Sequence, residues 1–158
     1  PCRSATLRAG SPMSIIHHRV GIAASSERVY DALSSLDGLS RWWAAHTTGS
    51  TRLGGIIHLP RDAGGYAMQV SDFQAGLLVH WKCVDGPREW IGTDVTFRLQ
   101  PEREQTFVQF THGGWADGVE AIGHASTKWA TFLLSLKHWL ERSEGRPFPY
   151  DMKVFVGD

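Results

Sequence analysis

The sequence predicts an α+β fold in which a curved antiparallel sheet of about six strands packs around one long helix near the end of the chain. Before residue 113 the chain consists mostly of short segments in which apolar and polar residues alternate, and connections of hairpin length separate them. The long helix is predicted from residues that recur at alternating intervals of four and three and therefore share one helical face. These residues are Ile122, Ser126, Trp129, Leu133, Leu136 and Leu140.

Two short helices are expected after a first strand at residues 15–23. Ser25 is a good N-cap, and Glu27 follows in the first turn, where the helix dipole favours a negative charge. The dipeptide Asp37-Gly38 is expected to end the first helix, and residues 39–43 to form another helical turn. The pair Trp42 and Trp43 closes this turn. Because adjacent side chains point in different directions, we expect one indole in the core and the other over its rim.

Alternation along the later segments predicts which side chains face the long helix. Turn signals such as Asp85-Gly86-Pro87 separate these segments, which predicts hairpins and an antiparallel sheet. The strands are expected at residues 51–59, 66–73, 77–84, 90–100 and 105–112. The inner face is expected to carry Tyr66, Met68, Val70, Val79, Trp81, Cys83, Val95, Phe97, Leu99, Val108, Phe110 and His112.

Composition places the chain among globular proteins and excludes several classes of partner. Its 158 residues suit one domain, expected over residues 13–158, and the formal net charge is zero. Nucleic acid and membrane insertion are therefore not expected, since the first needs a basic surface and the second a long apolar run. Cys2 and Cys83 form no disulfide framework, which favours a reduced, cytoplasmic protein. Residues 1–12 are expected to be a loose tail or an extension upstream of Met13.

The order of these elements resembles the helix-grip fold of the START-like (SRPBCC) superfamily, and within it the branch similar to the C-terminal domain of the heat-shock-protein-90 ATPase activators. The resemblance covers about residues 15–151. It is carried by residues 24–30, 39–43, 78–82, 106–113 and 145–149, and by His124 followed at five by Trp129. It implies a cavity between sheet and helix that takes an apolar small molecule, and it supplies no reaction.

Metal and nucleophile chemistry find little support in the sequence. The eight histidines show no metal-ligand spacing, and there is no Cys-x-x-Cys motif, so neither a metal nor a cofactor is expected. His124 and His138 fall with Lys128, Thr131, Ser135 and Arg142 on the helix face opposite the apolar stripe, which predicts that they are solvated. His112 is the polar candidate on the inner face. It could act as an acid or base, with His46 near the same opening, although a hydrogen bond to backbone is the more favoured interpretation.

The favoured hypothesis is the binding of an apolar or aromatic small molecule in the cavity between sheet and helix. The alternatives are a small cyclase or hydrolase that uses His112, and a chaperone-associated module that binds proteins through an exposed apolar patch. The protein is expected to be a monomer, or a homodimer joined through an edge strand. The predicted ligand-binding residues are Trp42, Trp43, Met68, Val79, Trp81, Val95, Phe97, Phe110, His112, Trp129 and Leu133.

Overall fold

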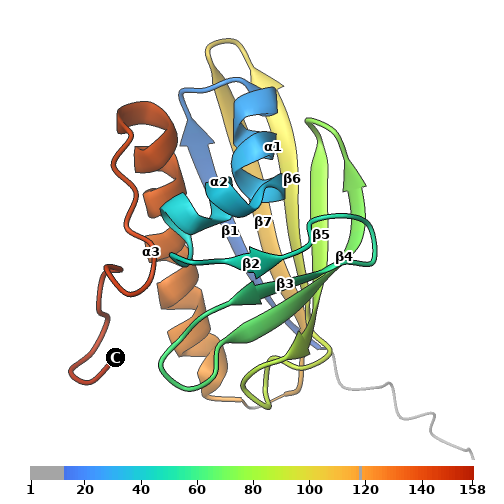
Figure 1. Ribbon diagram of the computed structural model, residues 1–158, viewed down its shortest axis with the longest axis vertical. Helices are drawn as coiled ribbons and strands as arrows, with labels where there is room; N and C mark the ends of the chain where they lie inside the picture. The colour runs from blue at the N-terminus through green and yellow to red at the C-terminus, as the bar shows by residue number, and fades with distance from the viewer. Residues whose placement is uncertain (1–12, 118) are drawn as a thin grey trace, which may run out of the picture.

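A curved antiparallel sheet packs against three helices in the computed structural model, which describes residues 13–117 and 119–158 (Figure 1). Within these residues the sheet has seven strands, where about six were expected, and the α+β helix-grip architecture is confirmed. The expectations for residues 1–12, including Cys2, lie outside the described residues. The elements are β1 (Ser14–Ile22), α1 (Ser26–Ser34), α2 (Leu36–Trp42), β2 (Thr48–Gly49), β3 (Ile56–Leu59), β4 (Tyr66–Gln74), β5 (Leu78–Asp85), β6 (Asp94–Glu102), β7 (Gln105–Trp115) and α3 (Ala121–Arg142).

The sheet order is β1-β7-β6-β5-β4-β3-β2, so the first strand pairs with the last one and the others form a meander. Both edges of this sheet are protected. The edge strand β2 has only two residues, and α3 covers part of β1, where Lys137 Nζ donates to the Gly21 carbonyl at 2.6 Å. Short or covered edges resist pairing with another chain. The structure therefore gives little support to a homodimer built by edge-strand pairing.

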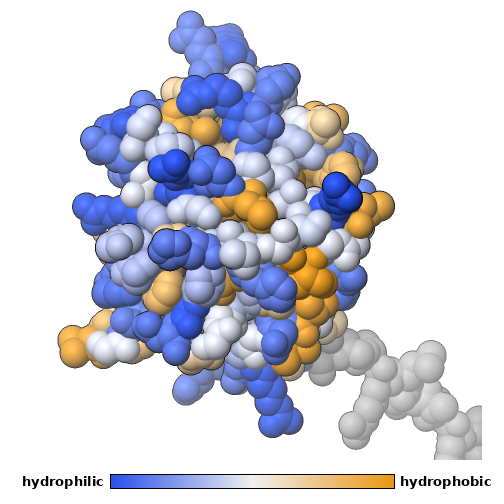
Figure 2. Space-filling view, viewed as in Figure 1, coloured by the Kyte–Doolittle hydropathy of each residue, from blue (hydrophilic) through white to orange (hydrophobic). Residues whose placement is uncertain are grey.

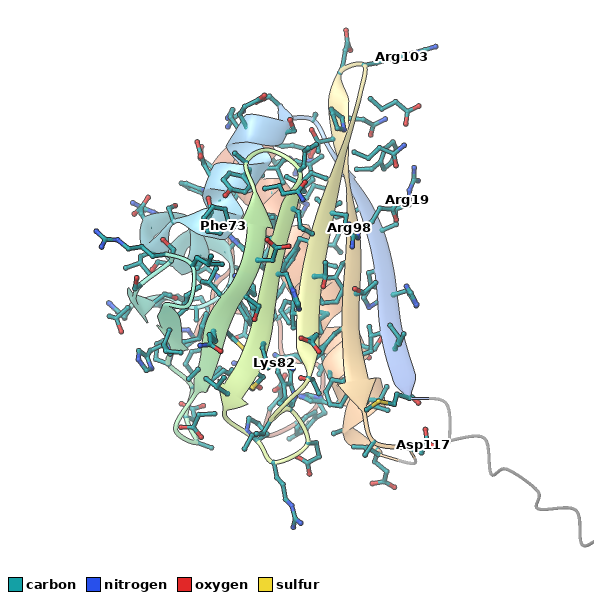
Figure 3. The ribbon with its side chains drawn as sticks, turned by 90° about the vertical axis from the view of Figure 1, so that its right-hand side faces the viewer. Arg19, Phe73, Lys82, Arg98, Arg103 and Asp117 are labelled. Carbon is teal, nitrogen blue, oxygen red and sulfur yellow. The ribbon has the colours of Figure 1, made fainter. Side chains whose placement is uncertain are left out.

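The predicted inner and outer faces of the sheet are confirmed. The apolar residues of β4 to β7 that were expected inside are buried, apart from the half-buried Tyr66. The intervening polar residues lie on the other face, where Arg19, Lys82 and Arg98 project away from the helices (Figure 3). Strand alternation alone was enough to separate these two faces, because the fold buries only one of them.

The short helices form as the caps predict, but their boundary differs from expectation. The Ser25 hydroxyl accepts a hydrogen bond from the Arg28 N–H at 3.3 Å and caps α1. Ser35 ends that helix, and its hydroxyl accepts from the Gly38 N–H at 3.0 Å, which caps α2. The expectation that Asp37-Gly38 interrupts the helices is wrong, since both residues lie in the first turn of α2.

Two strands begin later than the sequence predicts, because tight turns precede them. β3 starts at Ile56 after a turn in which the Gly55 N–H donates to the Arg52 carbonyl at 2.8 Å. β6 starts at Asp94, because residues 90–92 form a turn that Gly92 completes with a φ of +86°. The described residues contain no helix of the length and apolarity needed to cross a membrane.

Two exposed glycines provide a matched test of this backbone assignment. An added Cβ would meet no atom within 4 Å at Gly92 or at Gly123 in the first turn of α3, so only the backbone distinguishes the two sites. Gly123→Ala is expected to raise the free energy of unfolding by about 0.5 kcal/mol, because alanine restricts the unfolded chain. Gly92→Ala is expected to lower it by about 1 kcal/mol, because the left-handed region disfavours a Cβ. Urea unfolding measures both, and a change of the same sign in both variants would contradict the assignment.

Candidate functional site

The residues predicted to line a cavity form instead a continuous packed core around Trp129. The ring of Trp129 lies 4.6 Å from that of Phe110 and 4.9 Å from that of Trp43, measured between centroids. Aromatic rings at such distances are in contact, so side chains fill the space between the sheet and α3 around Trp129. Each of the following predicted site residues is at most 2% exposed: Trp42, Trp43, Met68, Val79, Trp81, Val95, Phe97, Phe110, His112, Trp129 and Leu133.

Trp42 and Trp43 both belong to this core, so the expectation that one covers a rim is wrong. Their rings are nearly parallel, with an interplanar angle of 16° and centroids 5.8 Å apart. Trp42 ends α2 and donates its indole N–H to the Ala32 carbonyl in α1 at 2.8 Å. Trp43 follows as the C-cap and stacks on Trp81 of β5 at 5.3 Å. Both indoles are therefore enclosed by the helices and the sheet, at 0% and 2% exposure.

His112 is fully buried and uses both ring nitrogens inside the core. The Trp129 indole N–H donates to His112 Nδ1 at 3.0 Å. Because an indole can only donate, Nδ1 is unprotonated, and the neutral ring carries its hydrogen on Nε2. Nε2 then donates to Thr93 Oγ1 at 2.8 Å, and that hydroxyl donates to the Trp90 carbonyl. This chain of hydrogen bonds leaves neither nitrogen of His112 free to act on a bound molecule.

Burial lowers the pKa of His112 to about 3, and the opposing effect of the Asp94 carboxylate is smaller. The ring is therefore neutral near pH 7, as its acceptor role towards Trp129 requires. His46, the proposed companion of His112, is exposed and lines a separate surface pocket with His58 and Asp85. The structure therefore does not bring His46 and His112 together at one opening.

A small pocket remains where the long helix meets the β3–β4 turn. Its volume is about 30 Å³, which is enough to hold a water molecule. Pockets that hold drug-sized ligands measure roughly 300–1,000 Å³. We call this feature the mouth pocket, and its lining residues are Trp43, Arg61, Tyr66, Trp90, His124, Ala125, Lys128, Trp129 and Phe132.

Two cationic side chains stand among the aromatic walls of the mouth pocket. The guanidinium of Arg61 lies 5.5 Å from the ring centroid of Tyr66 and 5.9 Å from that of Phe132, within range of cation–π attraction. Lys128 is 5% exposed, with Nζ 5.6 Å from the Phe132 ring. Sequence reasoning missed both residues, because Arg61 lies in a turn and Lys128 falls outside the apolar stripe.

The last described segment explains why Lys128 is buried. Residues 149–158, here called the strap, supply three acceptors to Lys128 Nζ. These are the Asp151 carboxylate, the Asp158 carboxylate at 2.7 Å and the Met152 carbonyl at 3.0 Å. Burial by itself raises the pKa of the Asp151 carboxyl, but hydrogen bonds from Lys128 and Lys153 hold it below its ordinary value. Burial also raises the pKa of the Asp158 carboxyl, but the hydrogen bond from Lys128 helps to hold it below its ordinary value.

The predicted solvated face of the long helix is therefore only partly correct. His124 and Arg142 are exposed, but Lys128 and Ser135 are each 5% exposed. The Ser135 hydroxyl donates to the Trp42 carbonyl at 2.8 Å and accepts from the Arg146 N–H at 2.7 Å. The chain after α3 folds back over this face of the helix. Helical periodicity cannot predict this, because it describes only the helix itself. Within the described residues, no group of three or more histidine, cysteine or acidic side chains could hold a metal ion.

Comparison with known proteins identifies relatives by sequence and by structure. Residues 23–141 match the family described as Activator of Hsp90 ATPase homolog 1-like protein. The solution structure of the Aha1 dimer from Colwellia psychrerythraea is 39% identical, with a TM-score of 0.78 over 84% of this chain and 100% of that chain. CalU16 from Micromonospora echinospora is 18% identical, with a TM-score of 0.70 over 83% of this chain and 78% of that one.

A third structure, the protein SSP2350 from Staphylococcus saprophyticus, is 16% identical, with a TM-score of 0.71 over 85% of this chain and 97% of that one. At such low identity, this likeness and that to CalU16 show the fold alone. A search of curated proteins found no match.

The hydrogen bonds of His112 predict an acid-sensitive core. Because the folded pKa lies below the unfolded value of about 6.5, only the unfolded chain takes up this proton as the pH falls. The contribution to stability is complete above about pH 6.5 and is lost towards pH 3, at up to about 1.4 kcal/mol per pH unit. His112→Gln keeps a donor and an acceptor but cannot titrate, so its stability deficit relative to the native protein should shrink as the pH falls. Chemical unfolding across this range measures the deficit, and a constant difference would contradict the buried, neutral assignment.

Proposed function

The chain belongs to the Activator of Hsp90 ATPase homolog 1-like family, and from this premise we propose that it binds an apolar or aromatic small molecule at the mouth pocket. The observation that carries the proposal is the position of this pocket. Aromatic side chains from the sheet side and from α3 converge there, among them Tyr66, Trp90 and Phe132. Lys128, which also lines the pocket, is bound by the strap.

The proposed site lies where a ligand can bind without separating the packed residues of the core. The residues around Trp129 are closed by mutual packing, and separating them would expose several buried aromatic rings at about 2–3 kcal/mol each. The mouth pocket, in contrast, adjoins a second pocket of about 250 Å³ that shares Arg61 and Tyr66 with it and is partly lined by the strap. A ligand that extends from the mouth pocket into this second pocket leaves the core packing and the ionic contacts of the strap intact.

The size of the opening limits the ligand and its affinity. A flat molecule of one or two rings that buries about 200 Å² of apolar surface gains roughly 5 kcal/mol at 25 cal/mol per Å². Because association also costs translational and rotational freedom, the dissociation constant should be no lower than about 0.2 mM. Titrations must therefore reach millimolar concentrations of ligand.

A second candidate function is the binding of a protein partner. Two findings favour it: the family is described by its likeness to an ATPase activator, and the related protein from Colwellia psychrerythraea is a dimer. The specific observation is a groove of about 560 Å³ between α3 and the chain that returns over it, flanked by the exposed Leu134 and Met152. On the face drawn in Figure 2, hydrophobic residues lie in small separate patches among polar ones. Light scattering tests whether the partner is a second copy of this chain. Co-purification tests whether the partner is a heat-shock ATPase.

Filling the mouth pocket is expected to abolish small-molecule binding. Ala125 of α3 lines the pocket at 2% exposure, and Ala125→Val adds two methyl groups to a space of about 30 Å³. Thr127→Val introduces the same side chain on the exposed face of α3 and serves as the matched control. The probe is naphthalene-2-carboxamide, and the readout is the NMR signal of each indole N–H.

We expect the signals of Trp90 and Trp129 to move in the native protein and in the control, and to stay in place in Ala125→Val. The signal of Trp139, which packs beside Arg41 and does not line the mouth pocket, should stay in place in all three proteins. Equal binding by Ala125→Val, or movement of the Trp139 signal without the other two, would exclude the mouth pocket as the site.

A further inference from the structure

The strap is held to the body of the protein mainly by charge. Three acceptors from the strap surround Lys128 Nζ, one for each of its ammonium hydrogens. The apolar side chains of the strap contribute little, since Tyr150 is 75% exposed, Phe155 56% and Val156 fully exposed. A segment attached in this way can be released when another anion takes over the lysine.

The two carboxylates are attached to Lys128 in different ways. Asp151 has a side chain that is 1% exposed and also accepts from Lys153 Nζ at 2.9 Å, so it has two cationic partners. Asp158 has Lys128 as its only cationic partner among the described residues, and it also accepts from the Val154 N–H at 2.9 Å. Asp158 is therefore the more replaceable of the two carboxylates.

The charge of the mouth pocket indicates which kind of ligand could replace the Asp158 carboxylate. Arg61 and Lys128 both line the pocket, and its lining contains no acidic residue. Among the described residues Arg61 forms no ion pair, and its guanidinium lies 4.9 Å from the ring centroid of Phe148. A ligand with an aromatic body and a carboxylate would match both the walls and the cations.

We propose that Lys128 is the carboxylate-recognition group of the mouth pocket and that the strap is a latch which a ligand carboxylate opens by replacing Asp158. The ligand class is an aryl carboxylic acid or a similar flat aromatic anion. This inference rests on the proposed small-molecule site and adds its charge preference and its regulation by the strap. Asp151 stays bound to Lys128 and Lys153 and holds the base of the strap in place.

The experiment compares two probes of the same shape, naphthalene-2-carboxylate and the neutral naphthalene-2-carboxamide, on three full-length proteins. Asp158→Asn removes the competing carboxylate. Asp62→Asn makes the same change of net charge at an exposed residue beside the strap that forms no ion pair with Lys128, and it is the matched control. Dissociation constants come from the NMR signals of the Trp90 and Trp129 indoles.

We expect Asp158→Asn to bind the carboxylate about tenfold more tightly than the native protein does, because the competing anion is gone. Its affinity for the carboxamide should change by less than about twofold, and Asp62→Asn should bind both probes as the native protein does. In the native protein the carboxylate should also move the amide signal of Val154, which donates to Asp158, whereas the carboxamide should not. This last readout needs no substitution and does not depend on the folding of a variant.

The outcomes separate the two proposals. If both probes bind with the same affinity to all three proteins and the Val154 signal stays in place, the small-molecule site stands and the latch is overturned. If neither probe binds to any of the proteins, both the site and the latch are overturned. Binding of the carboxylate to Asp158→Asn alone would overturn the latch as proposed, because a ligand carboxylate would then fail to replace Asp158 in the native protein.

Discussion

The hydrogen bond from the Trp129 indole to His112 Nδ1 is the contact on which the rest of the structure depends. It joins the middle of α3 to the inner face of β7 inside an apolar core, where an unpaired polar group would cost free energy on both sides. It is possible only while the imidazole is neutral, and burial keeps it so. The contact fixes how α3 sits on the sheet, and the neighbouring rings of Phe110 and Trp43 pack around that arrangement.

Much of this arrangement is predictable from the sequence, because strands and helices have fixed periods. Alternation placed Phe97, Phe110 and His112 on the inner face, and helical spacing placed Trp129 opposite them. Periodicity predicts which way a side chain points, but it does not predict how closely the sheet and the helix pack against each other. The residues predicted to line a cavity therefore face each other as expected, yet they fill the space between sheet and helix. The small volume that remains could be found only from the packed structure.

The errors at α3 have a different physical origin. Lys128 and Ser135 lie on the polar side of the helix, where solvent exposure is the ordinary expectation. They are buried because the chain after α3 folds back over them and supplies Asp151, Asp158 and the Arg146 N–H as partners. These contacts join residues far apart in the sequence and follow no periodic pattern. They also move the place of the proposed function from the interior to the mouth pocket, beside which ionic contacts hold the strap.

The ring nitrogens of His112 provide the most direct measurement of this account, by long-range proton–nitrogen NMR at about pH 7 and about pH 5. A closed core predicts a neutral ring at both pH values, with the hydrogen on Nε2 and an unprotonated Nδ1 that accepts from Trp129. A ring that becomes protonated between these pH values, or that carries its hydrogen on Nδ1, would contradict the account. It would mean that water reaches the inner face and that the space between sheet and helix is open.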